Sequence, residues 1–130
     1  MVSQFIYLVK YDWMILVYYM ASKDDSEEII RVLERLGCSD GNLTRAKRNL
    51  SGEMIDTGLT YTNNSQGVSV MVISESSSPE EFWNTLDHEK GHVVQHVAEA
   101  VGMDYRGEEI QYLSGEIAKR THPIARCFIR

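Results

Sequence analysis

The most constraining feature of this 130-residue chain is a long helix pattern that begins at Ser78. Ser78 is a favoured N-cap residue, and Pro79 is favoured at the first helical position. Apolar residues then recur at helical spacing as far as Val101, and Gly102 is typical of the residue that ends a helix. The sequence therefore predicts one continuous helix over residues 79–101.

The chain before this helix has the composition of strands and shorter helices. The segment Gln4–Met20 is rich in β-branched and aromatic residues and is divided at Tyr11 and Asp12, which predicts one long kinked strand or two short ones. An amphipathic helix pattern starts at Asp25, and a shorter one covers Asn42–Leu50.

Two further signals complete the predicted fold. The runs LTYT and VSVMVIS, at residues 59–62 and 68–74, are separated by a polar turn and predict a β-hairpin. A last helix is predicted from about Gly107 to Arg120, and Pro123 is expected to end it. We expect the whole chain to form one α+β domain, in which a small β-sheet packs on helices.

Composition and charge exclude several classes of protein. A hydrophobic fraction of 43% and a charged fraction of 25% are ordinary for a globular protein in water. The formal net charge of -6 and the scattered basic residues argue against binding to nucleic acid. We interpret the one basic cluster, Arg45, Lys47 and Arg48, as a solvated helix face.

The cysteine count and the N-terminal apolar run bear on the compartment. Cys38 and Cys127 are too few for a disulfide framework, and neither has a CxxC neighbour. The apolar run Trp13–Ala21 is shorter than the roughly 20 residues that span a membrane, and it lacks the basic start of an export signal. We therefore interpret this run as a strand and expect a cytoplasmic protein that does not bind membranes.

The motif that carries chemistry lies inside the long helix. His88, Glu89 and His92 form the pattern HExxH, in which two imidazoles fall one turn apart on one helical face. Zinc accepts neutral imidazole nitrogens, and a carboxylate beside the pair can take a proton from a zinc-activated water. The motif predicts a Zn²⁺ cofactor held by His88 and His92, with Glu89 as the base of a hydrolase.

A third protein ligand would complete such a site and leave one coordination position open. His96 continues the series, but three histidines at this spacing on a straight helix span roughly 12 Å, which is too far for one ion. Gln95 and Ala98 depart from the metzincin pattern HExxHxxGxxH. The remaining candidates by residue type are Glu99, Asp104, Glu108, Glu109, Glu116 and His122.

A glutamate at the start of the last helix is the best of these candidates. The short connection from Gly102 to Gly107 could fold that helix back across the first and bring in Glu108 or Glu109. Glu108 is preferred partly because Tyr112 follows it by four residues, on the same helical face. The Tyr112 hydroxyl would then lie over the site and donate to the developing oxyanion.

A resemblance to a known group covers most of the chain. It is carried by NTLDHEKGHVVQHVAEAVGMDYRGEEIQYLSGEIA and, upstream, by DGNLTRAKRNLSGEMIDTGLTYTN and SVMVISESSSPEEFWNTLDHE. These segments resemble small gluzincin-like HExxH zinc metallopeptidase-type proteins of phages and mobile elements of gut bacteria. In that group the last helix carries a glutamate, two residues, a small or polar residue, then tyrosine and leucine; Glu108, Gln111, Tyr112 and Leu113 match it here. The resemblance implies a minimal zincin-like α+β fold, with a sheet edge beside the active helix and Glu108 as third zinc ligand.

Two functions follow from these expectations. The first is a zinc metallopeptidase whose peptide or protein substrate lies as an added strand along a sheet edge near Gly67–Ser74. The second is a non-catalytic interaction module, a phage or mobile-element protein with a structural or vestigial zinc site. The first predicts cleavage that depends on Glu89, and the second predicts binding without cleavage.

Overall fold

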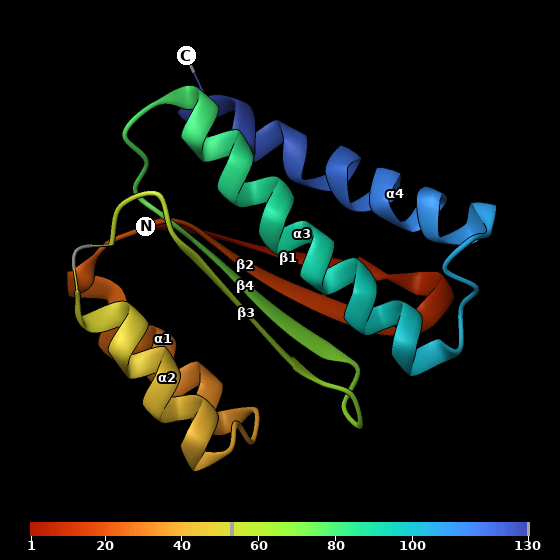
Figure 1. Cartoon of the computed structure of the whole chain (residues 1–130), viewed down its shortest axis with the longest axis horizontal. Helices are drawn as coiled ribbons and strands as arrows, with labels where there is room; N and C mark the ends of the chain where they lie inside the picture. Colours follow the sequence, from red (N-terminus) through yellow and green to blue (C-terminus); the bar gives the residue numbers. More distant parts are fainter. Residues whose placement is uncertain (53, 130) are drawn as a thin grey trace.

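A four-stranded sheet with helices on both faces forms the framework of the molecule (Figure 1). The computed structural model describes residues 1–52 and 54–129. The elements in chain order are β1 (Val2–Leu8), η1 (Val9–Tyr11), β2 (Trp13–Ala21), η2 (Lys23–Asp25), α1 (Ser26–Arg35), α2 (Asp40–Ser51), β3 (Gly58–Asn63), β4 (Val68–Ser74), α3 (Pro79–Val101), α4 (Glu108–Ala125) and η3 (Arg126–Phe128). The predicted α+β class is confirmed.

The sheet is mixed, with the strand order β1-β2-β4-β3. The β1/β2 and β3/β4 pairs are antiparallel hairpins, whereas β2 and β4 run parallel. The division of the N-terminal segment at Tyr11 and Asp12 is confirmed, because these residues lie in the connection between β1 and β2. The predicted hairpin of residues 59–62 and 68–74 is confirmed as β3 and β4.

The predicted sheet edge is wrong, because β4 pairs with β2 on one side and with β3 on the other. The free edge beside α3 is therefore β3. The run VSVMVIS is buried at six of its seven positions, which is typical of a strand covered on both faces and not of an edge. A hairpin pattern by itself does not say which of its two strands joins the rest of the sheet.

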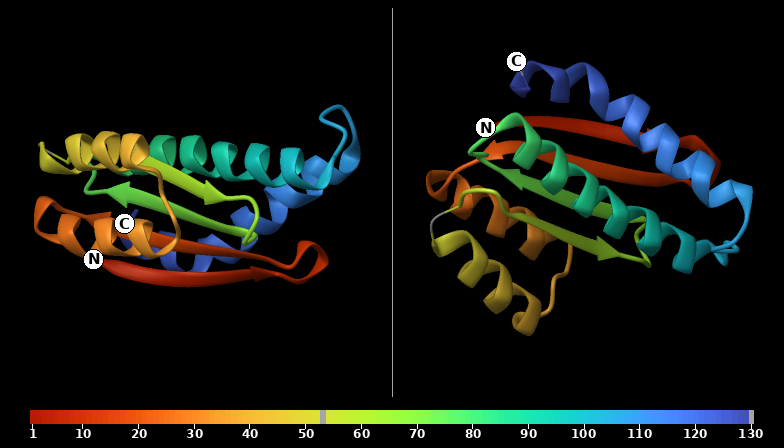
Figure 2. Two further views of the ribbon diagram at one scale, coloured as in Figure 1. Left: turned by 90° about the horizontal axis from the view of Figure 1, so that it is seen from below. Right: turned by 45° about the horizontal axis from the view of Figure 1, so that its top comes forward.

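Side chains alternate between two hydrophobic layers on opposite faces of the sheet. Ile15, Val17 and Tyr19 of β2 pack in the layer under α3 and α4, whereas Leu16 and Tyr18 pack in the layer under α1 and α2. Figure 2 shows the two helix pairs on opposite sides of the strands. The sheet thus holds α3 by its apolar face and leaves the opposite face of this helix to solvent.

The ends of α3 are those that the sequence predicts. The Ser78 side chain accepts a hydrogen bond from the Glu81 backbone N–H at 3.1 Å, and Gly102 ends the helix with a φ of 71°. A φ in this range favours glycine. The long helix is therefore defined at both ends by local chemistry, independently of the sheet beneath it.

The end of α4 differs from the prediction. The helix continues through Pro123 as far as Ala125. Proline removes only one backbone donor here, near the end of the helix. Beyond it, Ala125 is fully buried, and Ile124 and Phe128 pack against the same core. Tertiary packing therefore overrides the local stop signal.

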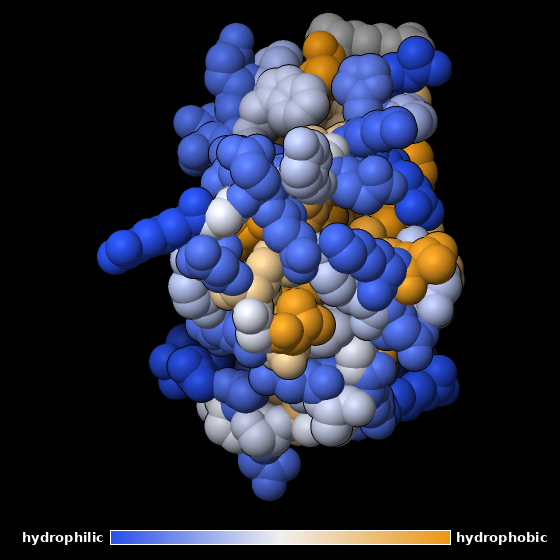
Figure 3. Space-filling model, turned by 90° about the vertical axis from the view of Figure 1, so that its right-hand side faces the viewer, coloured by the Kyte–Doolittle hydropathy of each residue, from blue (hydrophilic) through white to orange (hydrophobic). Residues whose placement is uncertain are grey.

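The described helices include none that is both long and apolar enough to cross a membrane. On the face of the molecule that Figure 3 shows, hydrophobic side chains are interspersed with polar ones.

Candidate functional site

The two histidines of the HExxH motif lie side by side on the exposed face of α3. Their Nε2 atoms are 3.2 Å apart, and the ring centroids are separated by 4.8 Å. The His88 side chain keeps 66% of its surface exposed. The motif therefore presents a pair of imidazole nitrogens to solvent from a rigid helix.

The spacing of this pair fits a shared zinc ion. Two nitrogens at about 2.05 Å from one zinc, at a tetrahedral angle, lie about 3.3 Å from each other. The Nε2 atoms of His88 and His92 are 3.2 Å apart, close to this value. These two residues can hold a metal as two neighbouring ligands.

Glu89 lies on the inner side of the same helix turn and is only 5% exposed. The Thr60 hydroxyl of β3 donates a hydrogen bond of 2.8 Å to its Oε1. The other carboxylate oxygen, Oε2, is 3.9 Å from Nε2 of His88. The carboxylate is thus held between α3 and the free edge strand, with one oxygen fixed by Thr60 and the other near the histidine pair.

Gly58, the first residue of β3, gives this carboxylate its space. A Cβ added at Gly58 would lie 2.6 Å from Cγ and 2.8 Å from Oε2 of Glu89. We expect Gly58→Ala to displace Glu89 and to lower the free energy of unfolding by about 1–3 kcal/mol, the usual cost of overpacking. Denaturant unfolding measures this effect.

Gly91 provides the matched control, because it lies in α3 and a Cβ added there meets nothing within 4 Å. Gly91→Ala should be neutral or stabilising by up to about 1 kcal/mol, since alanine favours a helix interior. A Gly58→Ala protein as stable as the wild type would contradict the close approach of β3 to Glu89.

The structure does not bring Glu108 to the histidine pair. Asp87 and Lys90 of α3 line the same small hollow as Ala118 and Thr121 of α4, so this part of α4 lies opposite the motif. Glu108 is ten residues before Ala118, which is about 15 Å along a helix. Among residues 1–52 and 54–129, no group of three His, Cys, Asp or Glu side chains is arranged to hold a metal.

Glu109 and Tyr112 face the hairpin of β1 and β2. Glu109 Oε2 is 3.4 Å from Lys10 Nζ. Tyr112 is 73% exposed and shares a hollow with residues 7–11. This arrangement supports neither Glu109, the alternative third ligand, nor the oxyanion role predicted for Tyr112.

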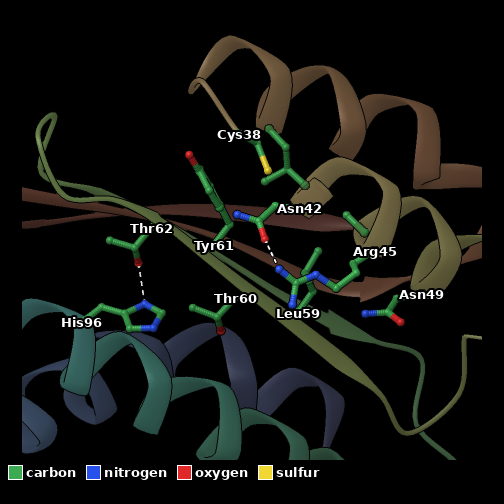
Figure 4. A pocket seen from close by; sticks show the side chains of 11 residues that line it. Cys38, Asn42, Arg45, Asn49, Leu59, Thr60, Tyr61, Thr62 and His96 are labelled. Atoms are coloured by element: carbon green, nitrogen blue, oxygen red, sulfur yellow. Dashed lines mark hydrogen bonds between the residues drawn. The ribbon is translucent and has the colours of Figure 1, made fainter. Parts of the chain in front are cut away.

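A groove of about 360 Å³ follows the free edge of β3, between α2 and α3 (Figure 4). Thr60, Thr62 and His96 line it on the α3 side of the strand. The alternate strand residues Leu59 and Tyr61 line it on the α2 side. Because successive residues of β3 contribute from both faces of the sheet, the groove lies over the unpaired backbone edge itself.

A chain of hydrogen bonds connects the groove to the core. The Trp13 Nε1–H donates to Ser69 Oγ at 3.0 Å, Ser69 and Thr62 share a hydrogen bond of 2.7 Å, and Thr62 Oγ1 is 2.8 Å from Nδ1 of His96. Indole nitrogen is only a donor, so the Ser69 hydroxyl is free to donate to Thr62 and the Thr62 hydroxyl to His96. In this direction Nδ1 accepts and a neutral His96 carries its proton on Nε2, whereas the reverse direction, with the proton on Nδ1, fits the same distances.

Burial of His96 makes the stability of the protein depend on pH. Burial lowers the pKa of His96, the nearby His92 lowers it further, and Glu99 partly opposes both. The folded state therefore keeps His96 neutral at pH values where the unfolded chain, with a usual pKa of about 6.5, takes up a proton. The stability contributed by this group is fully present above about pH 6.5 and falls as the pH drops toward the lower folded pKa.

We expect the wild type to lose more stability than His96→Gln when the pH is lowered from about 7.5 to about 5.5. Urea unfolding at the two pH values measures the difference. His122→Gln is the control, because His122 is exposed on α4, and it should behave as the wild type does. An equal loss of stability in wild type and His96→Gln would contradict the half-buried, neutral state of His96.

Several residues of this site were not predicted from the sequence. Thr60 and Thr62 alternate in a strand pattern, which indicates that they share a face, but their contact with α3 depends on the order of the strands. Gly58 lies just before the predicted strand run of residues 59–62, and Arg45 was interpreted as part of a solvated helix face. No family model, curated protein or solved structure matches this chain.

Proposed function

We propose that this protein is a zinc-dependent metallopeptidase. The observation that carries the proposal is the pair of imidazole nitrogens 3.2 Å apart, with a buried carboxylate oxygen 3.9 Å from one of them. Zn²⁺ bound by His88 and His92 would supply a Lewis acid that lowers the pKa of a water and polarises a peptide carbonyl. The remaining coordination positions would be open to water and substrate.

Glu89 acts as the general base in this proposal. Its Oε2 faces the side of the histidines and accepts the proton of the attacking water, and the carboxylic acid then returns a proton to the leaving amine. Thr60 holds Oε1 by a hydrogen bond, which fixes the direction in which Oε2 points. The wall formed by β3 and α3 limits the access of bulk water to the carboxylate.

The substrate is a peptide that lies along the free edge of β3. Edge strands present unpaired backbone groups that an extended peptide can bind as an additional strand. The groove over this edge reaches from Thr60, which contacts Glu89, to His96. A peptide there would pass next to the base and the histidine pair.

A digest of a peptide library tests the proposal. We expect zinc-loaded protein to cleave peptides, chelation to abolish the cleavage and added zinc to restore it, with fragments identified by mass spectrometry. Cleavage that survives chelation, or no cleavage by protein that is shown to contain zinc, would overturn it.

The high exposure of His88 favours a second candidate function, an interaction module in which the same groove binds a peptide without cleaving it. Intact peptide recovered from a complex with zinc-loaded protein would support this module and contradict the peptidase. In either case we propose a cytoplasmic setting, because Cys38 and Cys127 are both free.

A further inference from the structure

Arg45 is the one charged side chain of α2 that lines the β3 groove. Its guanidinium Nη2 donates a hydrogen bond of 2.5 Å to Oδ1 of Asn42. None of the ion pairs formed by the described residues involves Arg45. The guanidinium therefore keeps several donors and an unneutralised charge beside the groove.

The other polar groups of the groove also suit an acceptor ligand. Asn42 and Asn49 lie on the same wall as Arg45, and His96 lies across the strand (Figure 4). Where Nδ1 accepts from Thr62, a neutral His96 carries its proton on Nε2 and can donate it to a ligand. Among the described residues that line the groove, none carries a carboxylate.

The positive charge of Arg45 is felt at the wall of the groove. Burial raises the pKa of the Cys38 thiol, and the positive charge of Arg45 opposes that rise. Cys38 lies on the groove wall beside Leu33, which is near the C-terminal end of α1. Arg45 itself is exposed, so an anion in the groove would meet a positive charge that water screens, and the attraction is that of an exposed ion pair.

We propose that the groove binds an extended peptide as a strand added to β3 and selects an acidic side chain through Arg45. This inference rests on the proposed function and names the class of its substrate. Neutral peptides satisfy the edge of β3 but leave the guanidinium without a counter-charge. A peptide with an aspartate or glutamate pairs with the β3 edge through its backbone and with the guanidinium through its carboxylate.

Strand geometry makes the proposal specific. Side chains of an added strand alternate between the two faces of the sheet. An acidic side chain directed to Arg45 lies on the α2 side, so the residues before and after it face α3, where Glu89 and the histidine pair are. Cleavage sites should therefore fall at a fixed distance from an acidic residue.

Fluorescence anisotropy with two matched peptides tests the selection. The probes are a fluorescein-labelled ten-residue peptide of serine, threonine and valine with one central glutamate, and the same peptide with glutamine. They are bound to zinc-loaded Glu89→Gln protein, in which turnover is suppressed. We expect the glutamate peptide to bind about five-fold more tightly, as for an exposed ion pair.

Variants of α2 identify the residue responsible. Adding Arg45→Gln should remove the preference for glutamate. Arg48 is an exposed cation on the same helix that does not line the groove, so adding Arg48→Gln should keep the preference. Circular dichroism confirms that each variant is folded, and Arg45→Lys should retain part of the preference if its fold is sound. Equal affinity for the two peptides, or a preference that survives Arg45→Gln, would overturn the proposal.

N-methylated peptides test the strand addition separately. Methyl groups on alternate backbone nitrogens of the glutamate peptide block its hydrogen bonds on one edge only, so one of the two methylated sets should lose binding and the other keep it. Equal binding of both sets would contradict strand addition.

Binding and cleavage can fail independently. If zinc-loaded wild type binds the glutamate peptide with the expected preference but does not cut it, the proposed peptidase activity is contradicted and the recognition by Arg45 is not.

Discussion

Glu89→Gln is expected to slow peptide cleavage by about 10³-fold, since general base catalysis contributes 10² to 10⁴ in rate. Glutamine has the shape of glutamate and its carbonyl oxygen can accept the hydrogen bond from Thr60, so the fold should be retained. It has no basic oxygen to take a proton from water. Initial rates on a peptide identified in the library digest, at saturating zinc, measure the effect.

The zinc content separates loss of the base from loss of the metal. Glu89 is not one of the two nitrogen ligands, so Glu89→Gln should bind zinc as the wild type does. Glu99→Gln is the matched control, because Glu99 lies exposed on the same helix and should keep full activity. Cleavage by Glu89→Gln at a rate within about three-fold of the wild type would exclude Glu89 as the base.

Loss of either histidine of the pair is the second change with a large expected effect. His88→Ala and His92→Ala each remove one of two imidazole ligands, and we expect each to weaken zinc binding by at least about 100-fold, more than the loss of an outer partner. The double variant should show no specific binding. Competition with a chromophoric zinc chelator measures the affinities.

Zinc should also stabilise the wild type against thermal unfolding, because an ion that binds only the folded state adds its binding free energy to folding. His122→Ala is the control, since this exposed histidine of α4 lies outside the pair. Its affinity for zinc should equal that of the wild type. Unchanged affinity in both His88→Ala and His92→Ala would place the metal elsewhere.

Features determined by local chemistry were predicted from the sequence. The Ser78 cap and Gly102 define α3 without reference to the rest of the fold, and the spacing of His88 and His92 places them one turn apart on one face of any regular helix. The hairpin of β3 and β4 was predicted for the same reason, since its turn lies between two runs of strand composition.

Features that depend on packing between elements were missed. A helix that folds back after a short connection places its first residues beside the end of α3, not beside its middle. His92 is nine residues before Val101, about 14 Å along the helix, so the facing part of α4 comes near Ala118 and not at Glu108. The contact between Thr60 and Glu89 likewise depends on the order of the strands, which no local pattern specifies.

The central claim is that His88 and His92 together bind a metal ion and leave positions open for water and substrate. The visible spectrum of the protein titrated with Co²⁺, a spectroscopic substitute for zinc, tests it most directly. We expect one equivalent of cobalt to give the intense absorption of a four- or five-coordinate site in the wild type, and His88→Ala/His92→Ala to abolish it. A wild-type spectrum no different from that of the double variant, or from that of cobalt in water, would contradict the claim.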